Sequence, residues 1–332
     1  MNIESNVIKI YNTGNSSVLK HEKVLLKEPA PDEVRVKHFA IGLNFIDINM
    51  RNGNYSIQAY SPNSKSPYIL GVEGSGKIDS VGKNVKEFKV GDRVTHCMNL
   101  GTYSEYMNIN ANKIISIPEN ISFEIASAAI LKGLTAHYLI KELGNINKNQ
   151  TIVIHAAAGG VGSILCQWAQ FIGAKIIGIV SSDDKVSRIE KMGIDFSINT
   201  KKQNFSTEIM NITEGKGADV IYDSVGKNTI QKGLSCLTER GKLISYGNSA
   251  GAIEAIDISA LKPISGSLVC GGLLTFIKNR EKRQNNADEL FKLIINGILK
   301  IDINQRYKLK DIAIAHDEVE ARITTGSSII LP

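Results

Sequence analysis

The chain has few cysteines, four among 332 residues. Cys97, Cys166, Cys236 and Cys270 lie far apart and form no Cys-x-x-Cys pair, so neither a zinc-finger spacing nor a disulfide framework is visible. A chain with this cysteine pattern fits a reducing compartment. We therefore expect a cytoplasmic protein.

Aromatic residues and excess charge are also scarce. Phe, Trp and Tyr make up 6% of the chain, which weakens any case for the stacking platforms that bind single-stranded nucleic acid. Lys and Arg number 39 against 33 Asp and Glu, and the basic residues are scattered along the chain. The net charge of +6 favours mild attraction for anions, and the scatter of the basic residues, with so few aromatics, argues against a nucleic-acid partner.

We expect neither an export signal nor a membrane span. Glu4 and several asparagines stand where a signal peptide needs its apolar run. The longest apolar stretch, residues 151–180, is interrupted by His155, Gln170 and Lys175, and its glycines cluster at one turn. A buried strand, turn, helix and second strand explain this stretch better than a bilayer does.

The order of the elements predicts two domains. Residues 7–113 are a string of short β-branched runs separated by turns, typical of an all-β unit. Beyond Pro118, apolar strands alternate with amphipathic helices, which indicates a doubly wound α/β sheet. The expected strands are 151–155, 175–180, 196–199, 220–224 and 242–246, and the expected helices are 121–143, 162–172, 185–192, 205–212 and 229–237.

The chain after Pro263 contains a charged helix at 280–296 and two short β-like pieces, 305–309 and 328–331. We expect the last piece to rejoin the N-terminal unit. There is no internal repeat or low-complexity tract.

A glycine-rich turn carries the strongest local signal. In TIVIHAAAGGVGSILCQWAQ, a buried strand runs through Ala157-x-Gly159-x-x-Gly162 into a helix, which is the dinucleotide fingerprint with Ala at its first position. Small residues permit the tight turn and let the backbone and helix N-terminus approach a pyrophosphate. Such turns also carry glycine for packing alone, but the flanking strand, helix and next strand favour cofactor binding.

The end of the second strand indicates which nicotinamide dinucleotide is preferred. An acidic side chain there would bind the ribose hydroxyls, but Val180 and Ser181 are not acidic. The hydroxyls of Ser181 and Ser182 and the amine of Lys185 can meet a 2′-phosphate, so NADPH is favoured. The alternative is that an aspartate of the pair 183–184 takes the acid's role and Lys185 is a solvated helix residue.

Several segments together resemble a known family. AIGLNFIDINMRNGNY, GVEGSGKI, VGDRV, HAAAGGVG, IYDSVG, SYGNSAG and RITTGSSIILP are similar to the zinc-independent quinone oxidoreductases, the zeta-crystallin-like branch of the medium-chain dehydrogenase/reductase superfamily. The resemblance runs in order from about residue 7 to the last residue. It implies a GroES-like β-rich catalytic domain at 1–122 with 265–332, a Rossmann NADPH-binding domain at 123–264, and an active-site cleft between them.

The zinc ligands of the superfamily are missing. Zinc-dependent relatives place Cys and His where this chain has Asn44 and Val72, and the segment 92–103 has no room for their four-cysteine lobe. His96 and Cys97 are adjacent, but neighbouring strand residues point to opposite faces and no third ligand accompanies them. We expect no metal.

The resemblance also implies site residues by matching motif. It suggests that Asn44, Asp47 and Tyr55 serve catalysis near the nicotinamide. The implied cofactor contacts are Asn44, Lys132, Thr135, Ala158, Gly159, Gly160, Val161, Ser181, Ser182, Lys185, Thr200, Ser224, Tyr246, Gly247 and Asn248.

The chain departs from the family pattern at three places. Asn49 and Thr200 stand where the family often has Tyr, and loss of the second aromatic weakens the expected grip on the adenosine. The small residues 270–272 replace bulkier ones, which leaves active-site width and subunit contact open.

The polar candidates have simpler explanations as well. Asp47 is suited to capping a helix at 48–51, because Asp is a preferred cap. Tyr55 is suited to loop packing as much as to a substrate wall. His137, on an apolar helix, fits a satisfied core histidine better than a catalytic acid.

The implied activity is hydride transfer from carbon 4 of NADPH to a quinone-like acceptor, a reaction that needs little acid catalysis because water can protonate the quinol oxygens. Reduction of an activated carbon–carbon double bond in an enal or enone is the nearest alternative, and it requires a proton at the α-carbon. A non-catalytic NADPH-binding or RNA-binding role is a third hypothesis, although no basic aromatic patch supports it.

The apolar segment 267–274 predicts assembly. It follows the cofactor sheet without polar alternation, and an open apolar edge would invite aggregation unless covered. Pairing of two such edges about a two-fold axis would give a homodimer, as the resemblance also implies. Alternatively, the strand lies beneath the 280–296 helix of its own subunit.

Overall fold

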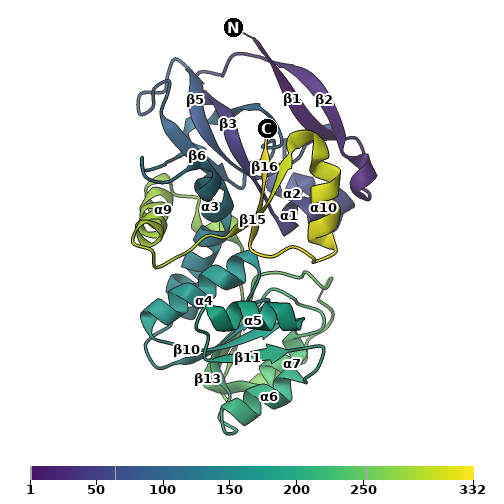
Figure 1. Cartoon of the computed structure of the whole chain (residues 1–332), viewed down its shortest axis with the longest axis vertical. Helices are drawn as coiled ribbons and strands as arrows, with labels where there is room; N and C mark the ends of the chain where they lie inside the picture. The colour runs from purple at the N-terminus through teal and green to yellow at the C-terminus, as the bar shows by residue number, and fades with distance from the viewer. Residues whose placement is uncertain (1, 64, 252) are drawn as a thin grey trace. The chain divides into compact units, whose positions relative to one another are not determined.

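A computed structural model describes the chain at residues 2–63, 65–251 and 253–332 (Figure 1). The chain divides into two compact units. The β-rich unit comprises Met1–Leu131, Ile277–Ile295 and Ile301–Pro332. The parallel-sheet unit comprises Lys132–Phe276 and Asn296–Lys300.

The β-rich unit is built on two sheets. A seven-stranded sheet has the order β15-β16-β3-β5-β6-β8, with β7 paired to β3, and a smaller sheet has the order β2-β1-β4. The C-terminal strand β16 pairs with β3, so the expectation that the last piece rejoins the N-terminal unit is confirmed. The strands are β1 (Ile3–Ile10), β2 (Lys20–Leu26), β3 (Glu33–Leu43), β4 (Tyr68–Ile69), β5 (Glu73–Val81), β6 (Arg93–Cys97), β7 (Tyr106–Asn110), β8 (Ile115–Ser116), β15 (Ile303–Lys308) and β16 (Ser327–Leu331).

Helices and short 3-10 turns complete this unit. A core of β-branched side chains from β3, β5, β6 and β7 includes Val34, Val36, Ile78 and Val94, because alternate residues of each strand face the same side. The helical elements are η1 (Ser16–Val18), α1 (Phe45–Asn52), α2 (Ile57–Tyr60), η2 (Ala111–Lys113), α9 (Arg280–Ile295), η5 (Leu309–Asp311) and α10 (Ile312–Glu320).

The parallel-sheet unit contains six parallel strands in the order β11-β10-β9-β12-β13-β14. The expected doubly wound sheet is confirmed, with one strand more than the five predicted. The strands are β9 (Thr151–His155), β10 (Lys175–Val180), β11 (Phe196–Asn199), β12 (Ala218–Asp223), β13 (Leu237–Ser245) and β14 (Ser267–Cys270).

Helices cover both faces of this sheet. Side chains of α6 and α7 pack on the face that presents Ile177 and Ile179, whereas Gly178, on the opposite face, approaches Ile189 of α5. Figure 1 shows α5 lying across the strands β10 and β11. The helical elements are α3 (Phe123–Tyr138), which begins in the β-rich unit, its π-helical continuation η3 (Leu139–Gly144), α4 (Gly160–Ile172), α5 (Asp183–Lys191), α6 (Phe205–Ile212), α7 (Ile230–Leu234), η4 (Ile258–Leu261) and α8 (Leu273–Phe276).

The turn from β9 into α4 is very tight. Ala156 has φ 53°, a left-handed backbone conformation that residues other than glycine rarely adopt. A Cβ atom on Gly162 would lie 2.2 Å from the Ala156 carbonyl oxygen. Glycine at this position is therefore needed for the helix to start directly against the strand.

The chain passes from one unit to the other later than at the expected boundaries after residues 122 and 264. The first boundary lies after Leu131, within α3, because the first two turns of this helix belong to the β-rich unit. The second boundary lies after Phe276, because β14 pairs with β13 and so belongs to the parallel sheet. Across the described residues, no helix combines the length and apolar character needed to cross a membrane.

Candidate active site

Except for Lys132 and Thr135 on α3, the expected cofactor contacts of the parallel-sheet unit gather at one edge of its sheet. Five of the turns they occupy follow β9, β10, β11, β12 and β13, and parallel strands end at the same edge. The chain leaves β9 towards β10 on one side and reaches β12 on the other, so the strand order reverses next to β9. Open α/β sheets bind ligands in the crevice at such a reversal.

The first of these turns offers backbone donors to an anion. Gly159 is the N-cap of α4 and the helix begins at Gly160. Ala158 is buried, whereas Gly159, Gly160 and Val161 are half-buried. The first N–H groups of a helix lack partners within it and carry positive partial charge, so this turn suits a pyrophosphate.

The turn after β10 presents hydroxyls and an amine. Ser181 is exposed, Ser182 caps α5, and Lys185 lies in the first turn of that helix, half-buried. The Thr200 N–H and hydroxyl both donate to the Val180 carbonyl, at 2.9 and 3.2 Å, which ties the end of β11 to the end of β10.

Asp183, one of the aspartates in the alternative interpretation, is engaged elsewhere. Its carboxylate accepts hydrogen bonds from Lys202 Nζ at 2.7 Å and from Asn199 Nδ2 at 2.9 Å. These bonds, that from Lys202 first, lower the pKa of Asp183. The Asp183 carboxylate thus faces the end of β11, and the choice between Lys185 and Asp184 at the ribose end of the cofactor stays a prediction.

The turns after β12 and β13 are packed on each other. The Ser249 N–H donates to the Ser224 carbonyl at 3.0 Å, and a Cβ atom on Gly247 would lie 3.1 Å from that oxygen. Tyr246 hydrogen-bonds Ser224, although burial raises the pKa of its hydroxyl. Asn248 lies against Gly226, so the last expected contacts pack together.

Sequence reasoning missed two buried residues beneath this edge. Asp223 Oδ1 accepts the N–H groups of Val225 at 2.7 Å and Gly226 at 2.9 Å and so shapes the turn. His155 lies beside it on β9, and burial lowers its pKa although Asp223 opposes this. Each is the polar last residue of an otherwise apolar strand, and this pattern in the sequence could have indicated both.

In the β-rich unit, Asn44 and Asp47 are brought together at the start of α1. Asn44 is the N-cap, and its N–H donates to Asp47 Oδ2 at 2.9 Å. Asp47 is fully buried and is the third residue of the helix, so it completes a capping box with Asn44 and is not itself the cap of a helix at 48–51. The helix begins at Phe45 rather than at the expected residue 48.

A third missed residue, Glu73, contacts Asn44. Glu73 lies on β5 and is fully buried, and Asn44 Nδ2 donates to its Oε2 at 2.7 Å. Its other oxygen accepts the Leu131 N–H. No local pattern around GVEGSG predicts these partners, since both are distant in sequence.

Tyr55 lines a hollow of about 350 Å³. It stacks on Tyr60 with ring centroids 6.0 Å apart and hydrogen-bonds Asn49, and burial raises the pKa of its hydroxyl. Tyr11 and Tyr68 line the same hollow. Tyr55 therefore combines loop packing with a place on a concave wall.

The candidates on α3 lie in the parallel-sheet unit. Lys132 and Thr135 are 6% and 7% exposed. His137 packs edge-on against Trp168 with ring centroids 5.6 Å apart, as a core histidine would.

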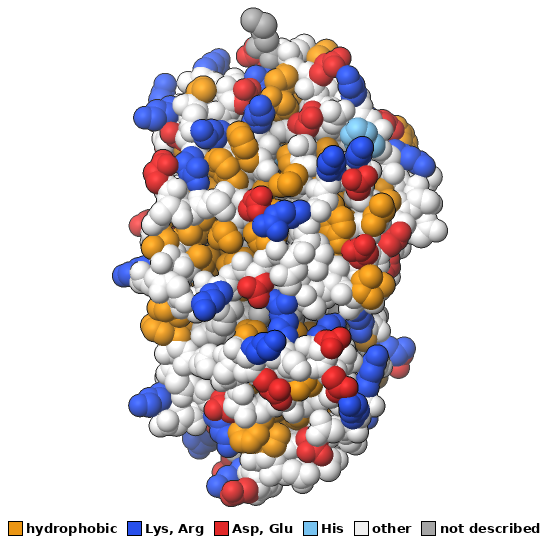
Figure 2. All heavy atoms as spheres, viewed as in Figure 1, with side chains coloured by type: hydrophobic (Ala, Val, Ile, Leu, Met, Phe, Trp, Pro, Cys, Tyr) orange, Lys and Arg blue, Asp and Glu red, His pale blue; other side chains and the backbone are white. Residues whose placement is uncertain are grey.

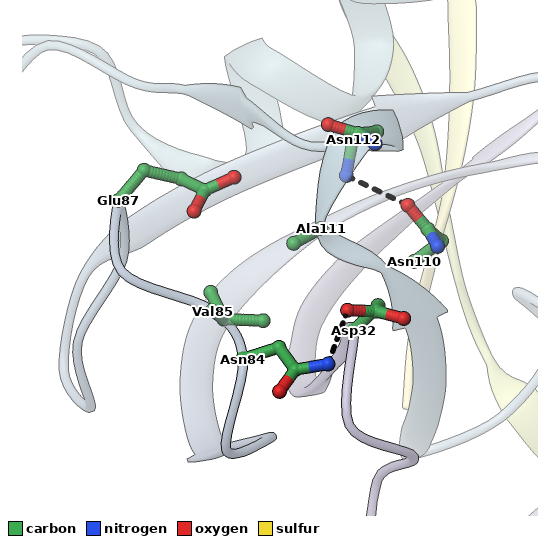
Figure 3. Close-up of a pocket in the computed structure, with 7 residues that line it drawn as sticks. All are labelled: Asp32, Asn84, Val85, Glu87, Asn110, Ala111 and Asn112. Atoms are coloured by element: carbon green, nitrogen blue, oxygen red, sulfur yellow. Dashed lines mark hydrogen bonds between the residues drawn. The ribbon is translucent and has the colours of Figure 1, made fainter.

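A second, smaller hollow lies in the β-rich unit and contains none of the expected site residues. It has a volume of about 190 Å³ and is lined by Asp32, Asn84, Val85, Glu87, Asn110, Ala111 and Asn112 (Figure 3). Asn84 Nδ2 donates to Asp32 Oδ1 at 2.9 Å, and Glu87 pairs at 2.6 Å with Arg280, which does not line the hollow, so these polar groups already have protein partners.

The described ranges contain no group of three or more His, Cys, Asp or Glu side chains that could hold a metal ion. His96 Nε2 instead meets His38 Nε2 at 3.0 Å, and burial lowers the pKa of His38 to about 4. On the face drawn in Figure 2, basic and acidic side chains are interspersed on both units.

Two family descriptions match the chain. Residues 30–119 match the alcohol dehydrogenase GroES-like domain, and residues 160–281 match the zinc-binding dehydrogenase family. These matches agree with the division into a β-rich and a parallel-sheet unit.

Full-length relatives agree with this assignment. The chain is 41% identical to a quinone oxidoreductase of Pseudomonas aeruginosa, over 96% of this chain and 97% of that one. It is 34% identical to a 2-haloacrylate reductase of Burkholderia sp., over 97% and 98%. The structure of Escherichia coli quinone oxidoreductase complexed with NADPH superposes with a TM-score of 0.93 at 39% identity, covering 98% of this chain and 100% of that one. The chain thus belongs to the quinone oxidoreductase family of the medium-chain dehydrogenase/reductase superfamily.

Proposed function

We propose that the protein is an NADPH-dependent quinone reductase that transfers a hydride from NADPH to a quinone-like acceptor. One observation supports this most strongly: the N-terminus of α4 and the turns after β10 to β13 meet at one edge of the sheet. The similarity to a quinone oxidoreductase complexed with NADPH, over nearly the whole chain, supports the same cofactor and substrate class.

The residues at the sheet edge fit the cofactor. The first N–H groups of α4, which begins at Gly160 after its N-cap Gly159, suit the pyrophosphate. Gly162 lets this helix start close to the end of β9. Lys185 with the hydroxyls of Ser181 and Ser182 would hold the 2′-phosphate. When bound, NADPH supplies the hydride from carbon 4 of its dihydronicotinamide, and the protein supplies binding and orientation.

The remaining chemistry asks little of the protein. The quinol oxygens take protons from water, so no strong acid is required.

Reduction of an activated carbon–carbon double bond is the second candidate. It is favoured by the similarity to the 2-haloacrylate reductase, whose named substrate carries such a bond. This reaction needs a proton at the α-carbon, and Tyr55, on the wall of its hollow, is the candidate donor.

The function is tested by steady-state NADPH oxidation against a panel of quinones, enals and enones. We expect turnover with quinones at least tenfold above that with enones. The reverse order would replace the proposal with the second candidate. Absence of turnover, together with filter binding of RNA at physiological salt, would support the non-catalytic hypothesis.

Activity is proposed to be independent of metal, because Asn44 and Val72 stand at the ligand positions. Metal analysis of the purified protein should find far less than one zinc per chain. A chelator should leave the rate unchanged. A tightly bound stoichiometric zinc would refute this.

Lys185→Ala should raise the KM for NADPH roughly tenfold, about 1.4 kcal/mol, with little change for NADH, because only NADPH carries the 2′-phosphate. Lys191→Ala, in the last turn of the same helix, is the matched control and should change neither value. Equal losses for both cofactors in Lys185→Ala would contradict the assignment.

We further propose a cytoplasmic homodimer formed through β14. This strand pairs with β13 along one side, and Leu268 and Val269 are half-buried at the edge of the sheet. An edge strand presents backbone N–H and C=O groups, and a copy of the same edge across a two-fold axis would satisfy them.

Val269→Pro should shift the light-scattering mass from dimer towards monomer at micromolar concentration, because proline removes a ladder donor. Val269→Thr keeps both the donor and the β-branch and should remain a dimer. A wild-type protein that sediments as a monomer at these concentrations would end the idea.

A further inference from the structure

The turn proposed to hold the 2′-phosphate contains a carboxylate of the same sign as that group. Asp183 is the first residue of α5 and lies between the cap Ser182 and Lys185. A phosphate monoester carries about two negative charges near pH 7, so a carboxylate beside it repels it and favours NADH instead. To select NADPH, the turn needs a positive charge that offsets Asp183.

Lys202 supplies this charge from the neighbouring turn. It follows β11 in the chain, and its Nζ lies 2.7 Å from Asp183 Oδ2. Both side chains are about two-thirds exposed, at 64% and 67%. Exposed ion pairs of this kind contribute little to stability, but they do change the charge that a neighbouring ligand meets.

A buried amide holds the Asp183 carboxylate in its place. Asn199, the last residue of β11, is 5% exposed and donates from Nδ2 to Asp183 Oδ1 at 2.9 Å. The orientation of this amide is fixed in turn, because its Oδ1 accepts the Lys201 N–H at 3.0 Å. Without the Lys202 amine, the carboxylate keeps its bond to Asn199, and its charge stays in the turn without an offset.

We propose that Lys202 determines cofactor specificity by offsetting the charge of Asp183 beside the 2′-phosphate, so that the net charge of this pair sets the preference for NADPH over NADH. The inference rests on the proposed function, because it takes the turn after β10 as the place of the 2′-phosphate. Lys202 acts through Asp183 and is not a ligand of the phosphate. Its role thus differs from that of Lys185, for which a direct contact is proposed.

Substitutions at the two positions change the net charge of the pair in both directions. Lys202→Ala leaves one negative charge, and Asp183→Asn leaves one positive charge. The double variant is neutral, as the wild-type pair is. Asparagine at position 183 keeps the shape of the side chain and an oxygen that can accept from Asn199.

The experiment compares the Kd values of NADPH and NADH for these four proteins by calorimetry at low ionic strength. Lys202→Ala should weaken NADPH roughly three- to tenfold without weakening NADH, because only NADPH carries the 2′-phosphate. The double variant should return to the wild-type preference, and Asp183→Asn should equal or exceed it. The loss in Lys202→Ala should shrink at about 0.5 M salt, since exposed charges are screened.

Lys216→Ala is the matched control. Lys216 pairs with Glu214 at 3.9 Å, and both precede β12, at the edge where the parallel strands begin. This variant also removes one positive charge from an exposed pair of the same unit, and it should keep the wild-type preference. A loss equal to that of Lys202→Ala would show a general effect of net charge and would contradict the inference.

The remaining outcomes separate this inference from the proposed function. A Lys202→Ala variant that keeps the wild-type preference, or that weakens both cofactors equally, overturns the inference alone. A loss that Asp183→Asn does not restore shows that Lys202 binds the phosphate directly, which also overturns it. A wild type that binds neither cofactor, or that does not prefer NADPH, overturns the proposed NADPH-dependent function, and the inference with it.

Discussion

The close approach of α4 to the end of β9 is the constraint on which the parallel-sheet unit depends. Gly162 has no space for a side chain beside the Ala156 carbonyl, and Ala156 itself adopts a left-handed conformation. This geometry starts the helix directly at the carboxyl edge of the sheet. Because the other strands are parallel to β9, their turns end at the same edge, where the N-terminal amides of α4 can meet an anion.

In the β-rich unit, buried polar contacts position the start of α1. Glu73 holds Asn44 and the backbone of α3, and Asp47 holds the start of α1. Removing one partner of such a contact leaves a buried charge or donor unsatisfied, which costs more than the contact itself contributes. These contacts therefore place Asn44 with little freedom.

The sequence predicted the elements of the parallel-sheet unit well, because each apolar strand is bounded by turn residues. The ranges expected for β9, β10 and β11 match those observed, and the glycine fingerprint located the start of α4 within two residues. The sequence predicted an apolar edge strand at 267–274 but set the domain boundary after residue 264, since a four-residue edge strand carries no periodicity of its own. Glu73 and Asp223 were missed because their partners come from other segments, and local patterns do not show long-range pairs. The sequence offered both a catalytic and a capping role for Asp47; the backbone of α1 shows the capping box, and the catalytic role stays a prediction.

The central claim is that the β9–α4 turn binds the pyrophosphate of NADPH, and fluorescence titration of Gly160→Val with NADPH tests it most directly. The branched side chain would stand where the pyrophosphate must approach the backbone at the first residue of α4. The account predicts affinity at least tenfold weaker than that of the wild type, with an unchanged circular dichroism spectrum and Tm. Wild-type affinity in this folded variant would contradict it.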